Sequence, residues 1–303
     1  MLALGPTWAQ DIQENRRRVC DIYDAIHGAL PADDLRVAPG QAYGDDPRQQ
    51  LDLYLPIAHD QTARPIVAFV HGGAFLRGNK DATPHIYANV PRLFARAGCI
   101  GVNIEYRLAP RAPYPAGADD VAAAVGWLRE HRGRLGRGPD THRAARPFYR
   151  WQPCRHLPDG SPLRGPDARR GGAALISARL DADTLPGNPN AAGVAAYYGA
   201  DPARQRRHAP MAHAEAMAVP LMVAVAEYEN PYLDLYALQY AARVAAAGRM
   251  PRIVQVARHN HTSIVAHLGS ADREFATALL DFVQAHAAPC PSFRPAQPPY
   301  RSS

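Results

Sequence analysis

The stretch that decides the fold runs from Val67 to Gly78 and reads VAFVHGGAFLRG. Its first residues complete a continuous apolar run that begins at Pro65. Such a run is typical of a strand covered on both faces in a mostly parallel sheet. Gly72 and Gly73 follow at once, and a backbone without side chains can turn sharply there and aim its N–H groups at a ligand. The same glycines would also suit an ordinary tight turn, so the choice between a ligand-binding turn and an ordinary one depends on the surrounding sequence.

Strand-like and helix-like segments alternate along most of the chain, which predicts an α/β fold with a mostly parallel sheet and helices on both faces. In such sheets ligands bind beyond the carboxyl ends of the strands. We expect an N-terminal cap segment over 1–45, a main domain over 46–288 and a Pro-rich tail over 289–303. Strands are expected at 49–56, 65–70, 99–108, 171–177, 219–230 and 252–261, and helices at 16–30, 85–97, 119–131, 233–247 and 271–286.

The composition indicates a globular protein, with 303 residues of which 47% are hydrophobic. The net charge is +6, but the stretch from His142 to Arg170 holds seven arginines against two aspartates and so accounts for five of the six charges. Because the basicity is local, we expect no nucleic-acid partner. The four cysteines show no paired spacing, which argues against disulfides and a zinc site. With no apolar run long enough for a membrane span or signal peptide, a soluble cytoplasmic protein is expected.

Two motifs together carry a family resemblance. HGGAF at 71–75 and NIEYRLAPRAPYPAGADDVAAAVGWL at 103–128 resemble the hormone-sensitive-lipase-like branch of the α/β-hydrolase carboxylesterases, over roughly 37–283. The resemblance implies that Gly72, Gly73 and Ala74 supply the N–H groups of an oxyanion hole, and that the YRLAP run is mainly structural. It also implies a catalytic triad in the order nucleophile, acid, histidine.

The acid and the histidine each have two candidates. Glu229, just past a predicted strand, is the closest match to the family's acid, and Glu227 is second. The H-N-H-x-S pattern at 259–263 offers His259 and His261, of which we favour His261 as the base. Outside this context, an exposed glutamate is most often merely solvated, and two histidines could be loop residues or a weak metal pair. No carboxylate at ligand spacing supports a metal, so neither a metal nor a cofactor is expected.

The nucleophile elbow G-x-S-x-G is missing from this sequence. None of the seven serines has glycines at both required positions. Ser161 is the only serine in the interval where the elbow belongs, and DGSPLRG offers it no elbow. Cys99 in AGCIG comes nearest as a thiol version, but it begins a strand instead of ending one.

The interval where the elbow belongs has the right length but the wrong residues. Across 139–172 we expect neither the buried strand nor the crossover helix, because apolar runs are lacking and prolines recur. A GC-rich gene read out of frame tends to yield Arg, Pro, Gly, Ala and His. Our leading hypothesis is that two compensating frame changes altered this segment. One alternative is a genuine basic insertion, whose Phe148, Tyr149 and Trp151 could stack on nucleic acid. The other is a genuine pseudoenzyme.

Together these observations predict a carboxylic ester hydrolase that acts on small esters through a nucleophile–His–acid mechanism and is weak or inactive as written. An arylformamidase-like amide hydrolase would share the same machinery. A catalytically dead hydrolase fold that binds a ligand is the alternative from a different class. The partner expected is a small-molecule ester, with no membrane involved.

Overall fold

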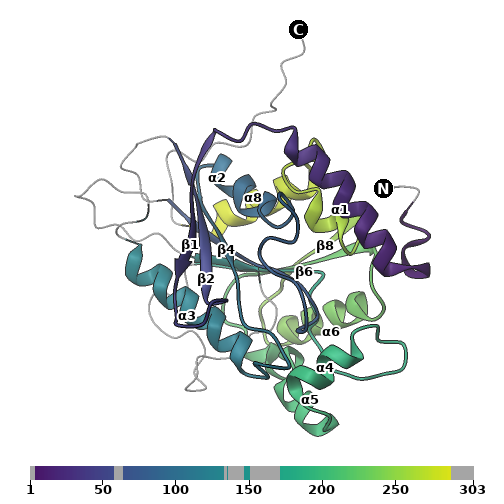
Figure 1. Cartoon of the computed structure of the whole chain (residues 1–303). Coiled ribbons are helices and arrows are strands. Elements are labelled where there is room, and N and C mark those ends of the chain that lie inside the picture. Colours follow the sequence, from purple (N-terminus) through teal and green to yellow (C-terminus); the bar gives the residue numbers. More distant parts are fainter. Residues whose placement is uncertain (1–3, 58–63, 133–134, 136–146, 151–170, 288–303) are drawn as a thin grey trace.

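One eight-stranded sheet forms the centre of the protein (Figure 1). The computed structural model describes residues 4–57, 64–132, 135, 147–150 and 171–287. The strands are β1 (Leu35–Ala42), β2 (Gln50–Pro56), β3 (Ile66–Val70), β4 (Ile100–Ile104), β5 (Pro147–Arg150), β6 (Ala173–Ile176), β7 (Leu221–Tyr228) and β8 (Arg252–Asn260). They lie in the order β1-β2-β4-β3-β5-β6-β7-β8. The β1·β2 and β2·β4 pairs are antiparallel and every other pair is parallel, which confirms the predicted α/β fold.

Helices cover both faces of the sheet, with α2 and α8 on one side and α3 and α6 on the other (Figure 1). The α-helices are α1 (Ile12–Gly28), α2 (Asn89–Arg96), α3 (Ala116–His131), α4 (Ala191–Tyr198), α5 (Pro202–His208), α6 (Leu233–Ala246), α7 (Ser263–Ala266) and α8 (Glu274–His286). Two short 3-10 helices, η1 (Trp8–Gln10) and η2 (Pro210–Ala216), complete the set. In the described ranges, no helix combines the length and apolarity needed to cross a membrane.

The two cores that flank strand β3 explain why its sequence is apolar throughout. Val67 and Phe69 pack into the core that includes α2 and α8. Ile66, Ala68 and Val70 point to the other face, toward α3. All five side chains are at most 3% exposed. A strand with cores on both faces gains from burial at every position, at about 1.5–3 kcal/mol for each large side chain, so alternation is absent.

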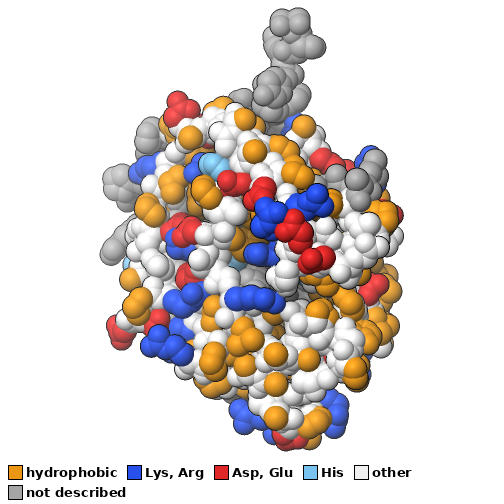
Figure 2. All heavy atoms as spheres, turned by 45° about the vertical axis from the view of Figure 1, so that its right-hand side comes forward, with side chains coloured by type: hydrophobic (Ala, Val, Ile, Leu, Met, Phe, Trp, Pro, Cys, Tyr) orange, Lys and Arg blue, Asp and Glu red, His pale blue; other side chains and the backbone are white. Residues whose placement is uncertain are grey.

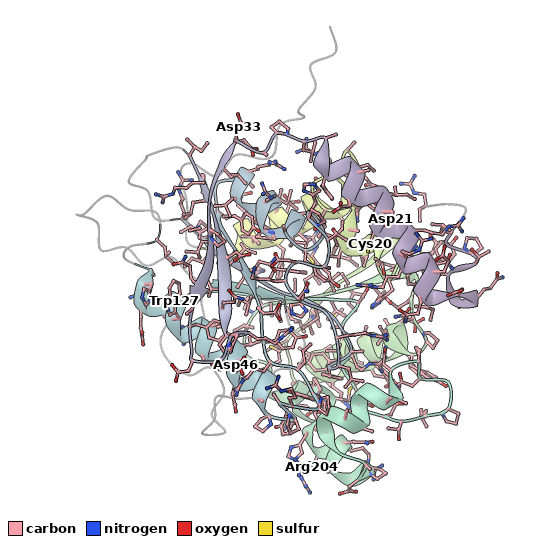
Figure 3. The ribbon with its side chains drawn as sticks, viewed as in Figure 1. Cys20, Asp21, Asp33, Asp46, Trp127 and Arg204 are labelled. Atoms are coloured by element: carbon pink, nitrogen blue, oxygen red, sulfur yellow. The ribbon has the colours of Figure 1, made fainter. Side chains whose placement is uncertain are left out.

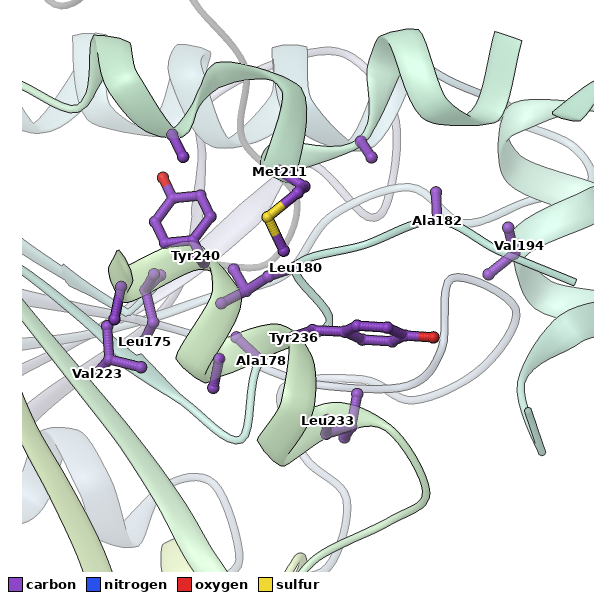
Figure 4. Close-up of a cluster of buried hydrophobic side chains, with 14 of the residues drawn as sticks. Leu175, Ala178, Leu180, Ala182, Val194, Met211, Val223, Leu233, Tyr236 and Tyr240 are labelled. Carbon is purple, nitrogen blue, oxygen red and sulfur yellow. The ribbon is translucent and has the colours of Figure 1, made fainter. Parts of the chain in front are cut away.

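A third core supports the strand ends that lead to the site. Leu175 of β6 and Val223 of β7 pack with Tyr236 and Tyr240 of α6 (Figure 4). Met211 of η2 belongs to the same cluster. Because α6 is packed firmly against these strands, the segments that follow β6 and β7 leave the sheet in defined positions.

The expectation that 139–172 supplies no strand is wrong for Pro147–Arg150, which forms β5 between β3 and β6. In register, Val67 pairs with Phe148 and Tyr149 pairs with Ala173. Parallel pairing uses backbone N–H and C=O groups, which every residue except proline offers in full, so a strand between two partners does not require an apolar run. Ser161, most of the basic stretch and the frame-change hypothesis fall on 136–146 and 151–170, which lie outside the described residues.

Several elements begin elsewhere than predicted. Helix α1 starts four residues earlier than expected, because the Asp11 carboxylate accepts a hydrogen bond from the N–H of Glu14 at 3.0 Å and caps it. Helix α2 starts only at Asn89 and α8 only at Glu274. In the segment expected as a cap, residues 35–42 form β1 and extend the sheet by one edge strand.

Candidate active site

Four parallel strands send their carboxyl ends toward one cavity of about 290 Å³. Gly72 to Ala74 follow β3, Ser177 follows β6, Asn230 lies just past β7 and His261 directly follows β8; all of them line the cavity. This is the edge at which open α/β sheets bind their ligands.

The N-terminal segment closes one side of this cavity. Trp8 is 1% exposed, and its Nε1–H donates to Oδ1 of Asn230 at 2.8 Å. On α1, Cys20 also lines the cavity (Figure 3). A hydrogen bond between residues 222 positions apart therefore ties the chain's beginning to the site.

The glycine turn after β3 contains residues with positive φ angles. Gly73 has φ +153° and Ala74 has φ +51°, conformations that side chains disfavour. The Gly73 carbonyl accepts hydrogen bonds from the N–H groups of Leu76 at 3.3 Å and Arg77 at 3.1 Å. No N–H of Gly72, Gly73 or Ala74 donates a hydrogen bond to another described residue. Those donors are therefore available to a bound oxygen.

Buried polar contacts hold the turn from below. His71 is fully buried, and its Nε2 lies 2.8 Å from Oε1 of Glu105. The Tyr106 hydroxyl donates to the His71 carbonyl at 3.1 Å, and Arg48 donates to Glu105 at 2.5 Å. Burial works to raise the pKa of Glu105, but its contacts with His71 and Arg48 outweigh burial and hold that pKa below its ordinary value. Tyr106, which opens the YRLAP run, thus serves to fix the turn.

The structure brings Glu229 and His261 into direct contact. Nδ1 of His261 lies 2.5 Å from Oε1 of Glu229. The Glu229 side chain is 3% exposed and the His261 side chain is 29% exposed. Burial works to raise the pKa of Glu229, but the charge and hydrogen bond of His261 outweigh burial and lower it. A carboxylate at Nδ1 selects the tautomer whose Nε2 can accept a proton, as a general base requires.

The second-choice residues lie elsewhere. Glu227 is exposed and accepts a hydrogen bond from the Arg258 N–H at 2.5 Å. His259 is buried, with Nε2 3.3 Å from Asp272 and Nδ1 3.1 Å from the Ser263 hydroxyl. The geometry therefore pairs Glu229 with His261, and it turns the other two away from that pair.

His259 belongs to a polar cluster that the sequence pattern did not indicate. Ligand-type atoms of His259, His267 and Asp272 lie within 4.8 Å of one another. The sequence showed no carboxylate at metal-ligand spacing beside the two histidines. The fold brings the carboxylate of Asp272, thirteen positions along the chain, next to His259. Burial lowers the pKa of His267 to about 4, and its Nδ1 lies 2.7 Å from the Ser263 carbonyl. These contacts tie the end of β8 to α7 and to the start of α8.

Two further cavity residues escaped the sequence analysis as site residues. Ser177 is 1% exposed with φ +46°, and its hydroxyl contributes to lowering the pKa of Glu229. Arg179, two positions on, is 4% exposed and lines the same cavity. Their place at the end of the strand predicted over 171–177 could have pointed to both, since ligands bind at such ends.

Comparison with known proteins finds sequence similarity over parts of the chain. The family model BD-FAE matches residues 51–141. Esterase LipI of Mycobacterium tuberculosis is 33% identical over 137 residues, which cover 38% of this chain and 42% of LipI. Carboxylesterase NlhH of the same species is 37% identical over 89 residues, covering 28% of this chain and 25% of NlhH. The chain thus spans less than half the length of these curated relatives.

Solved structures match over nearly the whole chain. A bacterial heroin esterase has a TM-score of 0.63 at 21% identity, covering 92% of this chain and 93% of its own. Esterase B from Lactobacillus rhamnosis has a TM-score of 0.69 at 16% identity, covering 93% and 96%. The chain therefore has the α/β-hydrolase fold of these solved esterases. Over the matched segments its sequence is similar to that of the curated carboxylesterases.

Proposed function

We propose that this cavity hydrolyses esters of carboxylic acids. The supporting observation is that His261, which is bonded to the buried Glu229, and the glycine turn line the same cavity. Nε2 of His261 takes the proton of the attacking nucleophile and passes it to the leaving alcohol, while Glu229 stabilises the charged imidazole. The N–H groups of Gly72, Gly73 and Ala74 bind the oxyanion that forms on the attacked carbonyl. Water then repeats these steps and releases the acid.

The cavity volume favours a small substrate. At about 290 Å³ the cavity lies at the lower end of the range for small-molecule sites, roughly 300–1,000 Å³. A short-chain or aryl ester fits this size. None of the proposed steps calls for a cofactor.

The nucleophile belongs after β5, in residues beyond those described, and the sequence offers no G-x-S-x-G there. We attribute this to the frame changes inferred across 139–172. The chain as written is then expected to turn esters over weakly or not at all.

The test compares the chain as written with a chain in which 139–172 is re-encoded in the shifted frame, using p-nitrophenyl acetate. The re-encoded chain should cleave the ester, and His261→Ala in it should lower kcat about 10³-fold or more. His286→Ala, on α8 and away from the cavity, serves as the matched control and should leave kcat unchanged. Equal rates in the two variants would remove His261 from the mechanism.

A ligand-binding role is the second candidate, and the missing elbow favours it. In that case the cavity binds small molecules that raise the melting temperature without being cleaved, in the re-encoded chain as well. An arylformamidase-like enzyme would use the same groups and differ in its substrate, so N-formyl anilides tested beside aryl esters separate it from an esterase.

A further inference from the structure

The guanidinium of Arg179 is buried beside the cavity and has terminal nitrogens without a hydrogen bond among the described residues. Arg179 is 4% exposed, yet neither Nη1 nor Nη2 makes a hydrogen bond within the part of the chain that the structure describes. Burial lowers the pKa of Arg179, but an arginine remains protonated in proteins. Leaving a buried charge unpaired is costly, so a cavity that keeps one is suited to an anionic ligand that pairs with it.

The neighbouring carboxylates do not fill this role. Asp183 accepts hydrogen bonds from the Tyr236 hydroxyl and the Asn188 amide, Asp181 accepts one from the Ala182 N–H, and Glu229 bonds His261. All three carboxylates act on Arg179 only at a distance, through their charge. Their hydrogen-bonding capacity is directed to other groups, which leaves both terminal nitrogens of the guanidinium buried and without a hydrogen bond among the described residues.

The cavity is positive as a whole. Its charged lining residues in the described ranges are Arg16, Arg77 and Arg179, with no aspartate or glutamate among them. Arg16 of α1 and Arg77 of the glycine turn are exposed, whereas Arg179 is buried. Figure 2, which brings the α1 side forward, shows Lys and Arg side chains, with Asp and Glu side chains among them, beside a hollow in the surface. Two exposed cations and one buried cation would attract an anion and then hold it.

The guanidinium also has a defined orientation. Its Cζ lies 6.0 Å from the centroid of the Tyr236 ring, within the range of a cation–π contact. Tyr236 is 4% exposed and belongs to the core around α6. Because the Tyr236 ring already holds the planar guanidinium in place, the guanidinium loses little further conformational entropy when it binds two oxygens of a ligand.

We propose that Arg179 binds the carboxylate of an anionic ester, such as a monoester of a short dicarboxylic acid, and so selects the substrate of this site. The inference rests on the proposed ester hydrolysis in the same cavity. The two N–H groups of one guanidinium match the two oxygens of a carboxylate. A phosphate brings further oxygens and charge, for which the described lining offers no second buried cation.

Calorimetric titration of the full chain with succinate, and with uncharged succinamide, tests the assignment. Succinate should bind at least tenfold more tightly than succinamide. Arg179→Met should weaken succinate binding by about 10- to 100-fold, and Arg179→Lys, which keeps the charge but not the fork, by an intermediate factor. Arg129→Met, at an exposed position of α3 outside the cavity lining, is the matched control and should weaken it less than about threefold.

Melting curves provide an independent readout. Because Arg179→Met removes an unpaired buried charge, its ligand-free melting temperature should equal or exceed that of the parent. Succinate should raise the melting temperature of the parent and not of this variant. Unchanged succinate binding in Arg179→Met, a clear drop in its ligand-free melting temperature, or tighter binding of inorganic phosphate than of succinate would each overturn the assignment.

Failure of this inference is distinguishable from failure of the proposed function. Cleavage of the neutral p-nitrophenyl acetate by the re-encoded chain, without Arg179-dependent succinate binding, would remove only the carboxylate subsite. Arg179-dependent binding without any ester cleavage would leave the subsite in place and remove the hydrolase.

Discussion

Replacing Gly73 with alanine should distort the glycine turn at a cost that the structure allows to be worked out. The new Cβ would lie 1.6 Å from the Arg77 carbonyl oxygen, and Cβ contacts below 3.0 Å essentially never occur. The backbone must therefore move by at least 1.4 Å, the difference between these two distances. The moving atom is a main-chain carbonyl, so no side-chain rotation can relieve the overlap.

This movement breaks identifiable contacts. The Gly73 carbonyl holds the N–H groups of Leu76 and Arg77, and each bond contributes about 1 kcal/mol. Placing a Cβ at φ +153° adds about 1–2 kcal/mol of backbone strain. We therefore expect Gly73→Ala to lower the free energy of unfolding by about 3–4 kcal/mol, out of the 5–15 kcal/mol typical of a domain.

Urea denaturation of the parent and the variant measures this change. Gly126→Ala is the matched control, because nothing lies within 4 Å of its new Cβ and the position is inside α3. That control should gain about 0.5–1 kcal/mol from the better helix propensity of alanine. If Gly73→Ala lowered the unfolding free energy by less than about 1 kcal/mol, the turn would not be as constrained as the structure indicates.

Three further changes have defined expectations. The pKa of Glu229 is lowered in the folded state, so its contribution to stability is present above its unfolded pKa of about 4.5 and is lost as the pH falls below that value. Glu229→Gln should therefore reduce the loss of unfolding free energy between pH 5 and pH 3. Equal acid sensitivity of the parent and the variant would contradict this. Leu279→Ala leaves a cavity at a core position that is 1% exposed, so it should lower the free energy of unfolding, measured by urea denaturation, by about 2–5 kcal/mol. A decrease below about 1 kcal/mol would contradict the close packing of Leu279. Asp120→Asn weakens a buried carboxylate that binds Arg107 through several nitrogens, so it should lower the melting temperature, and an unchanged value would show that the pair contributes nothing.

Strand β3 and its turn could be predicted because their signals are local. A continuous apolar run reports burial on both faces, and two adjacent glycines report a sharp turn. The contact between Glu229 and His261 spans 32 positions and has no local signal. It becomes predictable only once β7 and β8 are taken as parallel neighbours, because the carboxyl ends of such strands meet at one edge.

Other features could not be read from the sequence. Strand β5 forms from Pro147–Arg150 without an apolar run, because its neighbours present backbone groups that need pairing. The burial of Arg179 depends on enclosure by α6 and the cavity wall, to which an isolated arginine in the sequence gives no clue. The His259 cluster likewise draws on a carboxylate from the start of another helix.

The proposal of an esterase whose nucleophile segment is out of frame is tested most directly by sequencing the coding DNA across 134–174 and translating it in all three forward frames. A frame shifted by one base should encode an apolar strand followed by G-x-S-x-G. If every frame lacks that motif, the basic segment is authentic, the chain is related to hydrolases only by ancestry, and its cavity serves to bind a ligand.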